Sequence, residues 1–187
     1  RQPTLDDAAR APSDRCYTAM CGRFLTPDEA AFERCWHLAP PEGYRQSFNV
    51  APTQAAAVIR TRRDGSRSAE LFTWGFKPQW ANRHWINARA ETVFTSTAFQ
   101  RAASVQRCLV PAAGWYEWQG DEQPKRPYVH YRDDFAPIAL AGIWTGIGRA
   151  GEPGSTRTFA ILTGPAVQSI AFVHDRMPIV LDPAHYS

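Results

Sequence analysis

The chain has 187 residues, of which 44% are hydrophobic and 12% aromatic, so it can form one sizeable core but is too short for a second full domain. Its 21 basic and 18 acidic residues give a formal net charge of +3, a weak reason to expect a polyanionic partner. The sequence holds no run of about 18 apolar residues and no signal segment, so we expect no membrane partner and a cytoplasmic location, nucleoid-associated if the source is bacterial.

The first 19 residues predict a tail outside the native fold. They hold three arginines, three aspartates and few large apolar side chains, with no helical or strand period. A helix is predicted to begin at Pro27, with Thr26 as its N-cap. Its apolar face contains Phe32, Cys35 and Trp36.

A β-hairpin is predicted next, because AAAVIRTR (55–62) and SAELFTWGF (68–76) flank an Asp-Gly turn. Further strands are predicted at 107–112, 114–119, 126–132, 137–147 and 156–164, and short helices at 97–103 and 166–174. A polar loop is predicted at 148–157. This order predicts an α+β fold: a single domain over residues 20–187 with a mostly antiparallel, barrel-like bent β-sheet and short flanking helices.

The four cysteines predict neither a metal site nor a disulfide framework. They form no C-x-x-C pair and have no histidine at zinc-finger spacing. We therefore expect no metal and no cofactor. The cysteines are Cys16, Cys21, Cys35 and Cys108.

Four segments concentrate reactive side chains: MCGRF (20–24), INARAET (86–92), GWYEW (114–118) and FVHDRMP (172–178). Together they supply a thiol, an amide, a guanidinium, a carboxylate and an imidazole. This is the set expected of a site that attacks an electrophile beside a phosphate.

Each of these residues also has a structural explanation. Most free cysteines are buried small apolar residues, as Cys21 could be. Strand alternation could turn Glu117 to solvent, and His174 could be a hydrogen-bonded core or cap residue. Asn87 and Arg89 alternate on a short extended stretch, where outward polar side chains are ordinary.

Two further segments are FNVAPTQ (48–54) and WGFKPQW (74–80). In their order along the chain and in their residues, the six segments resemble the motifs of the SOS-response-associated peptidase (SRAP) family. These are abasic-site-processing proteins that crosslink to damaged single-stranded DNA. The resemblance runs from Met20 almost to the end of the chain. It implies the SRAP fold and a role in the DNA damage response.

The resemblance also implies a mechanism. The amine and thiol of an N-terminal Cys21 would condense with the open-chain aldehyde of an abasic deoxyribose to form a thiazolidine, and both groups are poised near neutral pH. Glu117 would hold the amine and shuttle protons. His174 would help to open the sugar ring or move protons, and Asn87 would bind a sugar or backbone oxygen.

Matching to the family further implies a DNA-binding surface. Arg23 and Arg89 would bind the phosphates beside the lesion. Asn49, Pro52 and Trp74 would hold unpaired bases and splay the strand, with Trp80 either stacking on a base or packing in a core. Residues 60–67, Arg83 and His84 could add electrostatic guidance, although a solvated hairpin tip explains the first equally well.

The family pattern starts at the methionine before the cysteine, whereas here nineteen residues precede Met20. We expect Met20 to be the natural initiator, with cleavage of the Met20–Cys21 bond as the alternative. Relatives continue beyond MPIVLDP, so we expect a chain shortened at its C-terminus.

Two other functions remain open from the residues. One is a cysteine-dependent peptidase or autopeptidase, with Cys21 as nucleophile, His174 as base and Glu117 or Asn87 as the orienting group. The other is a noncovalent single-strand binder. We expect a monomer whose partner is single-stranded DNA with abasic sites, with replication and repair proteins implied only by family likeness.

Overall fold

The computed structural model describes residues 21–120, 124–148 and 155–186. The predicted tail at 1–19 and most of the predicted loop at 148–157 lie outside these residues.

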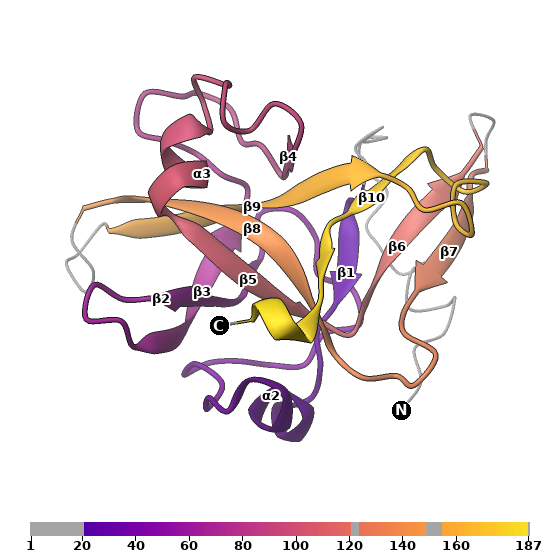
Figure 1. Ribbon diagram of the computed structural model, residues 1–187, viewed down its shortest axis with the longest axis horizontal. Coiled ribbons are helices and arrows are strands. Elements are labelled where there is room, and N and C mark those ends of the chain that lie inside the picture. Colours follow the sequence, from indigo (N-terminus) through magenta and orange to yellow (C-terminus); the bar gives the residue numbers. More distant parts are fainter. Residues whose placement is uncertain (1–20, 121–123, 149–154, 187) are drawn as a thin grey trace.

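Five strands close into a ring (Figure 1). They are β2 (Ala55–Thr61), β3 (Arg67–Trp74), β5 (Arg107–Ala112), β8 (Ile138–Ile147) and β9 (Thr156–Pro165). Strand β2 pairs antiparallel with β3 and β5, β8 pairs antiparallel with β5 and β9, and a parallel β3–β9 pairing completes the ring. The predicted α+β class and barrel-like sheet are confirmed.

Three short strands extend this sheet. Strand β4 (Asn87–Arg89) runs parallel to β9, β10 (Arg176–Pro178) runs antiparallel to β9, and β11 (Val180–Leu181) runs antiparallel to β8. Strand β9 therefore brings together segments 86–92 and 172–178, which lie far apart in the sequence.

The predicted β2–β3 hairpin is confirmed, and its turn chemistry is visible. Gly65 has a φ of +83°, a conformation that a residue without a Cβ adopts readily. The Asp64 carboxylate accepts hydrogen bonds from the backbone N–H and the hydroxyl of Ser66 at 2.9 and 2.7 Å.

A second, smaller sheet stands beside the ring, in the order β1 (Arg23–Leu25), β6 (Gly114–Gln119) and β7 (Arg126–His130). An isolated bridge between Phe24 and Val50 ties it to the segment before β2. At Gly114 the strands approach so closely that a Cβ would lie 2.4 Å from the carbonyl oxygen of His130, so this position requires glycine.

Helix α2 (Glu29–Trp36) confirms one prediction and corrects another. Phe32 and Trp36 are buried, as predicted. The N-cap is Asp28, whose carboxylate accepts from Ala31 N at 2.7 Å. Thr26 is not the cap, because its hydroxyl oxygen accepts from Ser47 N instead, tying the chain to the 44–50 segment.

The predicted helix near 97–103 is found as α3 (Gln100–Val105), and a 3₁₀-helix, η1 (Pro183–His185), lies near the C-terminal end. The predicted helix at 166–174 is wrong, because that segment forms successive turns. Its apolar residues do not share one buried face: Val173 is buried, whereas Val167 and Phe172 are exposed. No α-helix in the described part of the chain is both long and apolar enough to cross a membrane.

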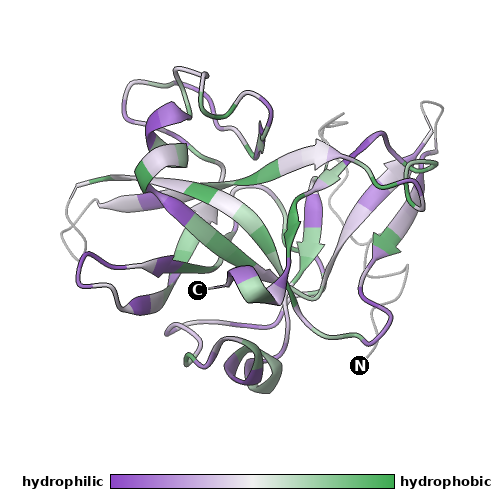
Figure 2. Cartoon of the chain, viewed as in Figure 1, coloured by the Kyte–Doolittle hydropathy of each residue, from purple (hydrophilic) through white to green (hydrophobic). Residues whose placement is uncertain are grey.

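The main core fills the ring and reaches into the small sheet. Figure 2 shows hydrophobic residues along β5 and β8 and hydrophilic ones at the tip of the β2–β3 hairpin. Phe24 and Trp115 of the small sheet belong to this core, and so does Cys21. Helices α2 and α3 cover separate clusters outside the ring. Residues 21–24 are therefore anchored at the junction of the two sheets.

Candidate active site

Cys21 and Glu117 meet because β1 and β6 are antiparallel. Arg23 lies opposite Tyr116, so the chain two residues earlier runs alongside the later part of β6. Glu117 shares a face of β6 with Trp115, which packs into the main core. The backbone N–H of Cys21 donates to Oε2 of Glu117 at 2.9 Å. Glu117 is only 4% exposed, so the alternative in which it faces solvent is wrong.

Burial shifts the titration of both groups. It raises the pKa of the Glu117 carboxyl, while the hydrogen bond from Cys21 N and the nearby His174 oppose that rise. The Cys21 side chain is fully buried, and burial followed by the charge of Glu117 raises the pKa of its thiol well above the usual value. In the full chain the Cys21 thiol therefore stays protonated near neutral pH, whereas the expectation of a poised thiol concerns a chain that begins at Cys21.

His174 follows the turns between β9 and β10 and is partly exposed. The side-chain amide of Gln119 donates to the carbonyl oxygen of Phe172 at 2.9 Å, which holds this segment against β6. The structure therefore brings the imidazole close enough to Glu117 to lower its pKa. His174 is not at the end of a helix, because the expected helix is absent.

Asn87 and Arg89 lie on β4, opposite Ile161 and Thr163 of β9. Asn87 is half-buried and Arg89 is exposed. Their predicted extended conformation is confirmed. The same strand, β9, continues to Pro165, which pairs with β10 just after His174.

Arg23 and Arg89 are the two arginines predicted to bind phosphates, and the charge of Arg89 contributes to lowering the pKa of the Glu91 carboxyl. Neither forms a salt bridge with any residue in the described ranges. Arg23 donates from Nη1 to the carbonyl oxygen of Gly22 at 2.8 Å, and partial burial lowers its pKa. Guanidinium groups without a carboxylate partner suit phosphate recognition.

Asn49 and Pro52 lie on the segment that the Phe24–Val50 bridge places beside β1. Both side chains are half-buried. This segment is therefore adjacent to the strand that follows Cys21.

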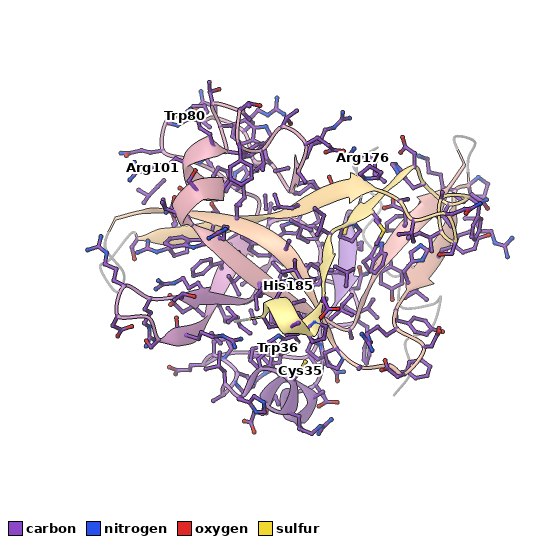
Figure 3. All side chains as sticks on the ribbon, in the orientation of Figure 1. Cys35, Trp36, Trp80, Arg101, Arg176 and His185 are labelled. Carbon is purple, nitrogen blue, oxygen red and sulfur yellow. The ribbon has the colours of Figure 1, made fainter. Side chains whose placement is uncertain are left out.

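Trp74 lies inside the core. It is 0% exposed, its Nε1–H donates to the carbonyl oxygen of Ile86 at 2.9 Å, and its ring centroid lies 5.1 Å from that of Phe24. A buried ring has no face to offer a base, so the prediction that Trp74 binds DNA is wrong in this conformation. Trp80 is 65% exposed and lies on the outer edge of its loop (Figure 3). Trp74 is therefore a core residue, whereas Trp80 is not.

We expect Trp74→Ala to lower the free energy of unfolding by about 3–5 kcal/mol, because it removes a large buried side chain. Trp80→Ala is the matched control and should change it by no more than about 0.5 kcal/mol. Denaturant unfolding of both variants measures this difference. Equal stabilities would contradict a core role for Trp74.

Two of the residues expected to guide DNA already have partners. Arg60 contacts Glu70 at 2.6 Å and stacks over the Trp144 ring. Arg83 lies over the Trp85 ring, 4.8 Å from its centroid. The positive charge of Arg60 in β2 is therefore partly neutralised by Glu70.

The sequence-based reasoning missed Arg176 and Glu91. Arg176 donates from Nη1 and Nη2 to the two carboxylate oxygens of Glu91 at 2.7 and 2.8 Å. This pair joins β10 to the residues after β4, and Figure 3 shows Arg176 near the end of β9. Both residues lie in the segments 86–92 and 172–178, and opposite charges within two such segments were the available signal.

A family model described as SOS response associated peptidase (SRAP) matches residues 20–187. The chain belongs to the SRAP family. It is 34% identical over 137 residues to "Abasic site processing protein YedK" of Escherichia coli (strain K12), covering 73% of this chain and 60% of that protein. It is also 34% identical over 184 residues to "Abasic site processing protein YoaM" of Bacillus subtilis (strain 168), covering 89% and 77%.

The fold of this SRAP chain also resembles a solved structure. A crystal structure of a protein from Bordetella bronchiseptica superposes with a TM-score of 0.75 at 24% identity, covering 89% of this chain and 86% of that one. At that identity the match shows a shared fold. The match to the Escherichia coli relative covers 60% of the length of that relative.

Proposed function

We propose that this protein captures abasic sites in single-stranded DNA by a covalent bond to Cys21. The observation that carries the proposal is the 2.9 Å hydrogen bond between Cys21 N and the buried Glu117 carboxylate. A carboxyl group with a raised pKa, held at the nitrogen of a cysteine, is suited to move protons at that nitrogen. The names of the curated relatives supply the substrate class.

The chemistry requires Cys21 to be the first residue of the active form. A peptide nitrogen is not a nucleophile, because amide resonance withdraws its lone pair. A free amine at the same place would pass a proton to Glu117, attack C1′ of the open-chain sugar and lose water to give an imine. The thiol then adds its sulfur to the imine carbon and its proton to the nitrogen, closing a thiazolidine.

The backbone at Cys21 supports this view. Its φ of +45° lies in the left-handed region, which costs roughly 1–2 kcal/mol for a residue with a Cβ. A first residue has no preceding carbonyl oxygen, so the clash of its Cβ with that oxygen is absent. The alternative of a thiolate peptidase is disfavoured, because burial and the Glu117 charge keep the Cys21 thiol protonated.

The surrounding residues suit a DNA strand at this place. Asn87 on β4 and His174 before β10 flank the same end of β9. In this proposal Asn87 holds a sugar or backbone oxygen and His174 moves protons during ring opening. Arg23 and Arg89 bind the flanking phosphates, and Asn49 and Pro52 contact the neighbouring bases.

The test is a chain beginning at Cys21, incubated with a single-stranded oligonucleotide that carries one abasic site. We expect a band that survives denaturing electrophoresis. Cys21→Ala should lose it, while Cys35→Ala, a half-buried cysteine on α2, should keep it. The proposal would be refuted if the unsubstituted chain gave no band with the abasic oligonucleotide, or if Cys21→Ala gave a band of equal strength.

We expect Arg23→Gln and Arg89→Gln each to reduce the salt dependence of capture. Each phosphate contact on single-stranded DNA contributes a slope of about 0.7 in log affinity against log salt concentration. Arg34→Gln, an exposed arginine of α2, is the matched control. Binding titrations at several salt concentrations measure the slopes, and slopes unchanged in the two site variants would remove these residues from the phosphate contacts.

A further inference from the structure

Arg176 ties the residues after β4 to the strand that follows His174. Its two terminal nitrogens donate to the two carboxylate oxygens of Glu91, and Nη2 also donates to the carbonyl oxygen of Thr163 at 2.9 Å. The Arg176 side chain is 12% exposed. A bidentate arginine–carboxylate pair fixes both the position and the plane of the guanidinium. The arginine is thus held both by β9 and by the residues after β4.

The main chain of the same arginine contacts the imidazole. Nδ1 of His174 lies 3.0 Å from the backbone N–H of Arg176 and 2.9 Å from Oδ1 of Asp175. In a neutral imidazole only one ring nitrogen carries the proton. Nδ1 therefore either accepts from Arg176 or donates to Asp175, and the two contacts exclude each other.

The contact with Arg176 is the better supported of the two. The Asp175 side chain is 87% exposed, so water can solvate its carboxylate without help from the ring. The Arg176 N–H belongs to β10, whose place is set by pairing with β9 and by the Glu91 pair. A main-chain donor that loses its partner is costly, whereas a solvated carboxylate that loses one is not.

We propose that Glu91 is a positioning residue that acts through Arg176 to hold His174 with Nδ1 as a hydrogen-bond acceptor and with the proton on Nε2. The nitrogen left for the reaction is then a hydrogen-bond donor. The Nε2–H of a neutral imidazole can donate a hydrogen bond to the ring oxygen and stabilise the charge that develops there as the sugar opens; this consequence rests on the function proposed above. The strong pairing is consistent with a Glu91 pKa lowered to about 2, chiefly by the hydrogen bond from Arg176.

The test is nitrogen-15 NMR of the His174 ring in the full chain, at a pH where the ring is neutral. The wild type should show the tautomer protonated at Nε2. Glu91→Ala should shift the population toward protonation at Nδ1, and Glu91→Gln, which keeps one acceptor for Arg176, should do so less. A wild type protonated at Nδ1, or a tautomer balance unmoved in both variants, would overturn the proposal.

A rescue variant separates positioning from general damage. Asp175→Asn replaces a carboxylate, which can only accept from Nδ1, by a neutral amide whose N–H can donate to Nδ1. The double variant Glu91→Ala, Asp175→Asn should therefore recover the tautomer protonated at Nε2. Failure to recover it in a folded double variant would count against the proposal.

The same variants connect the tautomer to capture of abasic DNA. In chains that begin at Cys21, Glu91→Ala should slow adduct formation at least roughly tenfold, and the double variant should restore the rate, because the wrong tautomer disables a catalytic histidine. A rate that does not follow the tautomer would overturn the link. If the wild type forms no adduct, the proposed function fails while the tautomer result still decides the role of Glu91.

Discussion

Replacing Glu117 by glutamine is expected to slow adduct formation by roughly two to four orders of magnitude, the usual contribution of a positioned acid or base. Glutamine keeps the size of the side chain and an oxygen that can accept from Cys21 N. It cannot take up the proton that the amine must lose. The measurement is the rate of adduct formation under single-turnover conditions, in a chain that begins at Cys21.

Glu33→Gln is the matched control, because this glutamate is exposed on α2. It should leave the rate unchanged. If Glu117→Gln captured abasic DNA at the normal rate, Glu117 would be a structural residue only. A general loss of folding would show instead as the absence of a cooperative unfolding transition.

Although Glu117→Gln should slow adduct formation, it should raise the folding stability of the full chain. A carboxyl group whose pKa is raised on folding binds its proton more tightly in the folded state. Folding stability is therefore lost as the pH rises from the usual glutamate range through the raised pKa. Glu117→Gln removes this loss, so at neutral pH the full-length variant should unfold at a higher temperature than the wild type.

In a chain that begins at Cys21 this gain should shrink or reverse. The α-ammonium group would then face the Glu117 carboxylate, and glutamine would leave a buried cation without its partner. Thermal unfolding of both chain lengths, each with and without the substitution, measures the effect. An equal gain in both lengths would argue that the amine does not sit beside Glu117.

The second large effect concerns the nitrogen of Cys21. A chain that begins at Cys21 but carries an acetyl group on its amine is expected to form no thiazolidine, because the acetylated nitrogen is an amide. The Cys21 thiol is unchanged in the acetylated chain. Any crosslink that the acetylated chain forms would therefore come from the thiol without the amine. Denaturing electrophoresis with the abasic oligonucleotide reads the result.

Noncovalent binding provides the control for acetylation. The acetylated chain should still bind single-stranded DNA, since Arg23 and Arg89 are unchanged. A chain that binds but does not crosslink locates the defect in the chemistry. An acetylated chain that crosslinks as well as the free amine would contradict the role of the nitrogen.

Much of the fold was predictable because local signals and tertiary structure agree. The predicted bounds of β5 and β6 match the structure, and the Asp-Gly turn lies where the hairpin needs it. The segment 166–174 failed because its apolar residues looked like one helical face although no neighbouring element buries that face. The closing β3–β9 pair was also beyond local reasoning, because it joins Thr73 to Thr158.

The site was predictable in its residue types and less so in its environment. Segment likeness pointed to Cys21 and Glu117, yet the burial that raises both pKa values depends on how β1 enters the core. Trp74 was misassigned because an aromatic residue in a recognition segment looks the same whether it faces a base or a core. Arg176 was missed because its partner, Glu91, lies 85 residues away in the sequence.

The most direct test of the central claim is NMR of the adduct formed with an oligonucleotide carrying carbon-13 at C1′ of the abasic sugar. We predict a saturated carbon bonded to both the sulfur and the nitrogen of Cys21, with no Cys21 thiol left to alkylate. An unsaturated imine carbon beside a free thiol, or a bond to sulfur alone with the nitrogen still in a peptide bond, would contradict it.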